Sequence, residues 1–230
     1  MACLNKYADA YYAGEALISD AEYDRLAAAA GRKVVGSRVR AKIPHSQPML
    51  SLRREYDPIG WHAEIGAPDV IVQPKIDGMA VALQFERGRL VLALSRGDGK
   101  LGCDITAAVA DLGAVRVPES FTGELRGELF TPLSAWRDRG KYRTPQSDVS
   151  ALVMTGKTAG SGIRFQGHDT APILCRDIVL ALAIVEPTRW TGAMGDVPVD
   201  GVVVKVADPA VRARMGDDGY VPLGAVSLKP

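Results

Sequence analysis

Short β-prone apolar runs, several of them interrupted by a charged residue, constrain the fold of this chain most strongly. The runs at 70–72, 79–85 and 89–95 have the lengths of strands, and the "ERG" that joins the last two predicts a hairpin with a three-residue connection. Similar β-prone apolar runs predict further strands within 121–130, 177–186, 197–206 and 224–230. We therefore predict a largely antiparallel sheet structure.

Helical patterns occur at the N-terminus. We predict a helical hairpin over 4–13 and 20–30, whose second helix begins at a capping box formed by Ser19 and Glu22. Residues 31–50 show no clear period and contain two prolines, so this stretch is predicted to be a linker or an extended connection.

Two short helices are predicted among the strands. Asp104 can cap one of them over 105–111. The other is expected to have Thr131 as its N-cap, Pro132 in its first helical position and Gly140 as its stop.

These patterns together predict an α+β chain in two parts. Residues 1–50 form a small helical lobe with its linker, and residues 51–230 form a mixed, largely antiparallel domain with short helices. The Gly-, Ser- and Thr-rich stretch 141–175 allows no assignment.

Composition excludes several classes of protein. Lysine and arginine number 28 against 27 aspartates and glutamates, so the chain lacks the charge to bind nucleic acid by charge alone. The widely spaced Cys3, Cys103 and Cys175 form neither a disulfide framework nor a zinc motif. No apolar run approaches the ~20 residues of a membrane span, and no secretory signal is present. We therefore expect no zinc, no membrane partner and a cytoplasmic location.

Charged residues interrupt four of the apolar regions. One such interruption is usually a charge at a strand end or sheet edge, because burying an unpaired charge costs several kcal/mol. Four interruptions that mix lysines with carboxylates fit better as the walls of one polar pocket. They are Lys75 with Asp77, Glu128, Asp200 with Lys205, and Lys229.

A pocket of lysines and carboxylates favours phosphoryl chemistry. Neighbouring cations favour the neutral form of an amine, so Lys205 and Lys229 would make Lys75 a better nucleophile. The same cations would pair with phosphate oxygens, and the carboxylates would hold a ribose or a divalent metal ion. A lysine that attacks phosphorus forms a phosphoramide.

The stretch "KIDGMAV" resembles the K-x-D-G nucleophile motif of the covalent nucleotidyltransferases, which include DNA ligases, RNA ligases and mRNA capping enzymes. Four further stretches resemble bacterial NAD+-dependent DNA ligases: "SRGDGKLGCDIT" the loop after motif I, "GELRGELF" motif III, "VDGVVVKV" motif IV and "AVSLKP" motif V. Upstream, "ISDAEYDRL" is similar to the segment of these ligases that grips nicotinamide mononucleotide (NMN), and "HSQPMLSL" to the segment that joins this lobe to the next domain. The stretches occur in the family order and cover nearly the whole chain.

The resemblance implies a covalent nucleotidyltransferase fold with Lys75 as the nucleophile. Lys75 would attack the α-phosphorus of NAD+, release NMN and hold AMP for later transfer to a 5′-phosphate at a DNA nick, as in DNA repair and replication. Asp77, Lys205 and Lys229 complete the implied catalytic set. The implied cofactor contacts in this domain are Gln73, Ile76, Arg96, Glu128 and Asp200. Mg²⁺ is implied as well, with Asp77, Glu128 and Asp200 as its carboxylates.

In the N-terminal lobe the resemblance implies NMN contacts from Tyr11, Tyr12, Asp20, Tyr23 and Asp24. Two of these have a structural alternative. Tyr23 could simply face the core of the lobe, and Asp20 could be a first-turn charge that favours the helix dipole.

Three departures from the family pattern indicate a divergent branch, such as the short second bacterial ligases or viral enzymes. Gln73 stands where the family has an acidic residue, so adenine recognition is expected to change. Tyr11 and Tyr12 stand where a Tyr-His pair is common, and Gln146 stands where an arginine is common.

The chain ends at Pro230, directly after the motif V stretch. The expectation is therefore an excised adenylation fragment or one subunit of a split ligase, whose partner is an OB-fold-containing segment or a second subunit. Nicked duplex DNA would bind weakly without further domains.

Two other interpretations remain open. An ATP-dependent nucleotidyltransferase, such as an RNA ligase or a capping-type enzyme, would share Lys75 and the motif order, although the "SDAEYDRL" lobe argues against it. A non-catalytic NAD+-binding module would keep the pocket but form no adduct.

Overall fold

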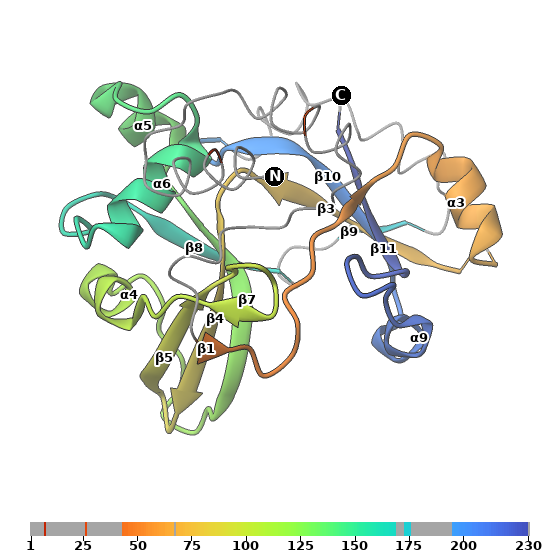
Figure 1. The fold of residues 1–230 in the computed structure, drawn as a ribbon, viewed down its shortest axis with the longest axis horizontal. Coiled ribbons are helices and arrows are strands. Elements are labelled where there is room, and N and C mark those ends of the chain that lie inside the picture. Colours follow the sequence, from red (N-terminus) through yellow and green to blue (C-terminus); the bar gives the residue numbers. More distant parts are fainter. Residues whose placement is uncertain are drawn as a thin grey trace. The chain divides into compact units, whose positions relative to one another are not determined.

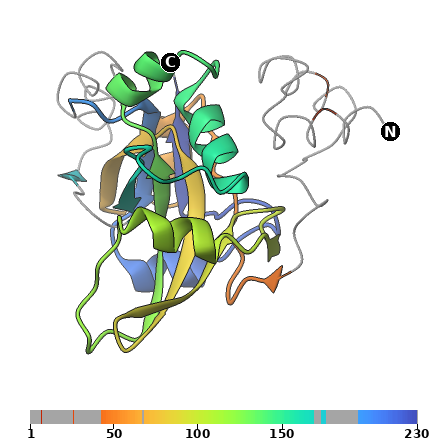
Figure 2. The same cartoon turned by 90° about the vertical axis from the view of Figure 1, so that its left-hand side faces the viewer.

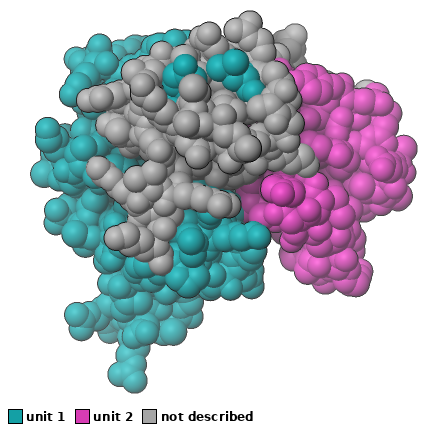
Figure 3. All heavy atoms as spheres, in the orientation of Figure 1, with its two compact units in different colours: residues 1–49, 78–168 teal, residues 50–77, 169–230 magenta. Residues whose placement is uncertain are grey.

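The computed structural model describes residues 43–66, 68–168, 173–175 and 195–229, together with the single residues Tyr7 and Leu26. The predicted helices at 4–13 and 20–30 and the predicted strand at 177–186 therefore lie outside the stretches that can be compared. The chain divides into two compact units, coloured separately in Figure 3. Unit 1 comprises residues 1–49 and 78–168, and unit 2 comprises residues 50–77 and 169–230. The division at 1–50 and 51–230 remains a prediction.

Unit 1 is built on a four-stranded antiparallel sheet in the order β5-β4-β7-β8 (Figure 1). Its strands are β4 (Met79–Glu86), β5 (Arg89–Ser95), β7 (Gly123–Phe130) and β8 (Arg164–Gly167). The helices α4 (Thr106–Leu112) and α6 (Pro145–Met154) lie in front of this sheet in Figure 2 and share its core. Val81, Leu83 and Leu129 are fully buried in that core.

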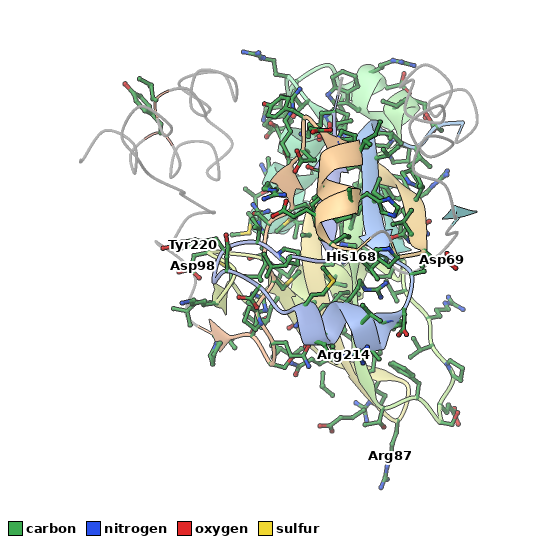
Figure 4. The ribbon with its side chains drawn as sticks, turned by 90° about the vertical axis from the view of Figure 1, so that its right-hand side faces the viewer. Asp69, Arg87, Asp98, His168, Arg214 and Tyr220 are labelled. Carbon is green, nitrogen blue, oxygen red and sulfur yellow. The ribbon has the colours of Figure 1, made fainter. Side chains whose placement is uncertain are left out.

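The predicted hairpin between β4 and β5 is confirmed, but its turn has two residues rather than three. Arg87 and Gly88 have φ values of 49° and 75°. Positive φ at both central residues suits the type I′ turn, whose twist matches that of paired strands. Arg87 lies at the tip of the hairpin (Figure 4).

The predicted helix after Asp104 is confirmed as α4, but its N-cap residue is Ile105 rather than Asp104. Asp104 Oδ1 accepts hydrogen bonds from Thr106 Oγ1 at 2.6 Å and from Thr106 N at 2.9 Å. The side-chain bond and then the backbone bond hold the pKa of Asp104 below its usual range, because both stabilise the carboxylate.

The next helix, α5 (Leu133–Arg139), corrects the predicted cap. Pro132 is the N-cap residue and makes no side-chain cap bond. Thr131 is instead fully buried and donates from Oγ1 to Asp148 Oδ2 at 2.8 Å. The predicted stop is confirmed, because Gly140 adopts the left-handed conformation with φ 58°.

Two further elements of unit 1 fall where the sequence allowed no assignment, namely α6 and β8. Thr144 caps α6 by accepting a hydrogen bond from Ser147 N at 3.1 Å, and Pro145 occupies the first helical turn. A two-stranded pair, β1 (Ile43–Pro44) with β6 (Leu101–Gly102), completes the described strands of unit 1.

Unit 2 contains a five-stranded sheet in the order β2-β11-β10-β3-β9. Its strands are β2 (Arg53–Arg54), β3 (Val70–Ile76), β9 (Ile173–Cys175), β10 (Val199–Val206) and β11 (Ala225–Leu228). All neighbours are antiparallel except β2 and β11. The helices are α3 (Pro58–Glu64) and α9 (Pro209–Met215).

One face of this sheet forms the core of unit 2. Val72, Val202 and Val204 are fully buried there together with Trp61 of α3. The structure is therefore a mixed α+β one with antiparallel sheets and short helices, as predicted. Among the described residues, no helix is both long and apolar enough to span a membrane.

Candidate functional site

The second face of the five-stranded sheet carries the lysines that the sequence singled out. Strand alternation places Gln73 and Lys75 of β3 opposite the buried face of Val70 and Val72. The register carries this face across β10 and β11, because Gln73 pairs with Val203, which pairs in turn with Ser227. The face, called here the lysine face, comprises Gln73, Lys75, Lys205, Ser227 and Lys229.

Asp200 joins the lysine face through a β-bulge. Val199 pairs with Ile76 and Gly201 pairs with Lys75, so Asp200 is the extra residue between two consecutive partners of β3. Gly201 has φ 154°, and a Cβ atom there would lie 2.2 Å from the carbonyl oxygen of Leu228. The bulge therefore requires glycine directly after the aspartate, which accounts for the Asp-Gly pair in "VDGVVVKV".

Two lysines converge on the carboxylate of Asp200. Lys229 Nζ lies 2.6 Å from Asp200 Oδ2, and Lys75 Nζ lies 3.2 Å from Asp200 Oδ1. The side chains of Lys75, Asp200 and Lys229 are 27%, 28% and 35% exposed, so the trio is open to solvent on one side. Asp200 Oδ1 accepts no hydrogen bond of good geometry from the described part of the chain.

The remaining members of the lysine face are buried. Gln73 is 6% exposed and Lys205 is 8% exposed, so both lie below the surface beside the trio. Ser227 is buried as well and donates from Oγ to the carbonyl oxygen of Arg53 at 3.1 Å, which ties β11 to β2.

Asp77 and Ile76 lie at the end of β3. The backbone N–H of Asp77 donates to the carbonyl oxygen of Pro198 at 2.9 Å, which extends the pairing of this region by one bond. Ile76 is buried, and alternation directs its side chain away from the lysine face. Any contact of Ile76 with a ligand on that face would therefore come from its backbone.

Unit 1 carries the other predicted carboxylate, Glu128 of β7. Its Oε1 lies 3.5 Å from Nε2 of His168, the residue that follows β8. Glu128 Oε2 is buried and has no hydrogen-bond partner among the described residues. Sequence reasoning missed His168 because nothing in a lone histidine indicates that β7 and β8 are neighbours, with Glu128 opposite Gln166.

Arg96, the second predicted contact in unit 1, begins the loop between β5 and β6. It is half-buried, and its backbone N–H donates to the carbonyl oxygen of Ala80 at 3.1 Å. Gln146 lies in the first turn of α6.

The predicted NMN contacts of the N-terminal lobe, Tyr11, Tyr12, Asp20, Tyr23 and Asp24, lie outside the described residues. Within the described stretches, no three His, Cys, Asp or Glu side chains gather as a group that could hold a metal ion by themselves.

Comparison with known proteins identifies relatives of the chain. Residues 39–150 match the family described as the NAD-dependent DNA ligase adenylation domain. This stretch includes Lys75, Asp77, Arg96 and Glu128, whereas Asp200, Lys205 and Lys229 lie beyond it.

Curated relatives extend the match to nearly the whole chain. The DNA ligase of Chloroflexus aurantiacus is 35% identical over 95% of this chain, and that of Thermobifida fusca is 27% identical over 98%. DNA ligase 1 of Nocardia farcinica is 29% identical over 96% of this chain. The alignments cover 42%, 40% and 42% of these relatives, so the chain spans about two fifths of their length.

Proposed function

The chain belongs to the family of NAD-dependent DNA ligase adenylation domains, and from this premise we propose that it transfers AMP from NAD+ to its own Lys75. In the proposed reaction Lys75 attacks the α-phosphorus of NAD+ and becomes lysyl-AMP, while NMN leaves. The observation that carries the proposal is the convergence of Lys75 and Lys229 on one carboxylate.

The trio is suited to an anion larger than a carboxylate. The ammonium group of Lys229, which pairs with Asp200, can equally pair with the oxygens of a phosphate, and Lys205 is a second cation on the same face. Preplaced cations stabilise the negative charge that develops on phosphorus during attack, and they need no reorganisation when the reaction occurs.

The attack requires the neutral amine of Lys75. Asp200, whose Oδ1 is 3.2 Å from Lys75 Nζ, is the carboxylate placed to accept the proton that the amine loses. A bond then forms between Nζ and the α-phosphorus, and the bond from phosphorus to the bridging oxygen breaks. NMN leaves with that electron pair, which balances the step.

Further residues are proposed as ligands of the dinucleotide. In unit 2, the buried amide of Gln73 would bond to the base, and Ile76 would contribute through its backbone. In unit 1, Arg96 and Glu128 are proposed to contact the ribose or a phosphate, and Glu128 Oε2 is a buried acceptor suited to a hydroxyl. Tyr11, Tyr12, Asp20, Tyr23 and Asp24 are proposed to bind the NMN half.

Mg²⁺ is proposed as the metal ion. It prefers hard oxygen ligands and usually takes only one or two carboxylates plus substrate phosphates, so it does not need a group of three protein ligands. Asp77, Glu128 and Asp200 are the candidates, and Glu128 Oε2, a buried carboxylate oxygen without a hydrogen-bond partner among the described residues, fits this use. When bound, the ion would neutralise phosphate charge.

The choice of nucleotide tests the proposal directly. We expect the 230-residue chain, incubated with Mg²⁺ and NAD+, to gain the mass of one adenylate, and to do so about a hundredfold faster than with ATP. Intact-mass spectrometry of timed samples measures both rates. An adduct with ATP but not NAD+ would instead identify an ATP-dependent nucleotidyltransferase. Binding of NAD+ without any adduct would identify a non-catalytic module.

The relatives are named DNA ligases, so we also propose that the adenylate passes to a 5′-phosphate at a nick in duplex DNA, as in repair or replication. An OB-fold-containing segment or second subunit is the proposed partner for that step. It would supply further phosphate contacts, on which binding to a DNA duplex depends. A cytoplasmic location belongs to the same proposal.

A further inference from the structure

Residues 43–49, here called the strap, are bound to β7 by side chains of that strand. Arg126 donates from Nη2 to the carbonyl oxygen of Gln47 at 2.6 Å and from Nη1 to that of Pro48 at 3.0 Å. Glu124 accepts from Ser46 Oγ at 2.7 Å and from Arg126 Nε at 2.6 Å. These bonds hold the strap in place without any help from His45.

The charged state of Glu124 supports this attachment. Burial raises the pKa of Glu124, but the hydrogen bonds from Arg126, Ser46 and Gln84 outweigh it and leave the pKa below its usual range. Glu124 therefore stays ionised near neutral pH and keeps its bonds to the strap.

The strap in turn holds the loop that begins at Arg96. His45 Nε2 lies 3.0 Å from the carbonyl oxygen of Arg96. The backbone N–H groups of His45 and Met49 donate to the carbonyl oxygens of Lys100 and Gly99 at 3.0 and 2.8 Å. Because a carbonyl oxygen only accepts, Nε2 must carry the hydrogen of the His45 ring.

Among these contacts, His45 supplies the side chain that is hydrogen-bonded to Arg96 itself. The Arg96 N–H is held by Ala80, and its carbonyl oxygen accepts from Gly99 N at 3.0 Å as well as from His45. A Cβ atom on Gly102 would lie 3.0 Å from the His45 ring, so the ring is closely packed against the loop. Because the N–H and the carbonyl group of Arg96 are both hydrogen-bonded, the backbone of this residue is fixed. The direction of its Cα–Cβ bond is fixed with it.

We propose that His45 is a positioning residue for the reaction, which orients Arg96 toward the nucleotide through its bond to the Arg96 carbonyl oxygen. The proposal rests on the proposed role of Arg96 in binding NAD+. His45 itself touches neither the nucleotide nor the reacting atoms.

The test is a double-mutant cycle on the full chain, read as the maximal rate of adduct formation and the NAD+ concentration that gives half that rate. His45→Ala is expected to raise the half-saturating concentration by about fivefold to tenfold, with the maximal rate changed less than about twofold. His45→Gln should return the half-saturating concentration of NAD+ to its normal value, because a glutamine amide can also donate to the Arg96 carbonyl. In a chain that already carries Arg96→Ala, adding His45→Ala should change the half-saturating concentration of NAD+ by less than about twofold.

His62→Ala is the matched control. His62 Nε2 also bonds to a backbone carbonyl, that of Pro68 at 2.8 Å, but in unit 2. This variant should lower the thermal midpoint and leave the half-saturating concentration unchanged.

Three results separate the possible failures. Equal effects of His45→Ala with and without Arg96, or an unchanged half-saturating concentration in His45→Ala, would overturn the role of His45 and leave adenylation standing. The absence of any adduct from the unmodified chain would overturn the proposed function and this inference together.

Discussion

Lys75→Arg is expected to abolish adduct formation, with a fall in rate of at least about a thousandfold. Arginine keeps the positive charge and can keep the ion pair with Asp200, which Lys75 makes at 3.2 Å. A guanidinium cannot lose its proton in a protein, however, so the variant has no neutral nitrogen to attack phosphorus. Intact-mass spectrometry after incubation with NAD+ and Mg²⁺ measures the effect.

Lys157→Arg is the control for that substitution. Lys157 is exposed and lies in unit 1, outside the lysine face, so this variant should form the adduct at the normal rate. If the Lys75→Arg chain, shown to be folded by circular dichroism, still acquired adenylate, Lys75 would not be the nucleophile.

Asp148→Ala is expected to lower the free energy of unfolding by about 3 kcal/mol or more. Asp148 is completely buried in α6 and accepts hydrogen bonds from Arg139 Nη2 at 2.6 Å and from Thr131 Oγ1 at 2.8 Å. Its removal would leave Arg139 without its carboxylate and the buried hydroxyl of Thr131 without an acceptor. Urea titration followed by circular dichroism measures the loss.

A neighbouring aspartate provides the comparison. Asp138 is exposed on α5, so Asp138→Ala should change the free energy of unfolding by no more than about 0.5 kcal/mol. Equal stabilities of the two variants would show that the network around Asp148 contributes little to folding.

The sequence predicted the strands of the lysine face because each combines a β-prone run with a local signal. β3, β10 and β11 each contain or adjoin a lysine inside an apolar stretch, which pointed to a polar pocket. Which residues share a face could not be predicted, since it depends on the register between strands far apart in the chain. The pairing is regular from Gly201 to Val206, and the bulge shifts it only between Val199 and Gly201, which adds Asp200 to this face.

Two Thr-Pro pairs show how tertiary context changes a local signal. Thr144 and Pro145 begin α6 as an N-cap and a first-turn proline, whereas Thr131 before Pro132 turns inward to bond Asp148. The side-chain acceptor is supplied by a helix that follows later in the chain, so the sequence around Thr131 could not reveal it. The same reason explains why His45 and His168 were not predicted, because each contacts a residue distant in sequence.

Peptide mapping of the adenylated chain identifies the nucleophile, because the lysine face offers three amines to the same phosphate. After incubation with NAD+ and Mg²⁺, we expect tandem mass spectrometry to find adenylate on Lys75 and on neither Lys205 nor Lys229. Adenylate on either of those two lysines, or a Lys75 peptide that stays unmodified, would contradict this expectation.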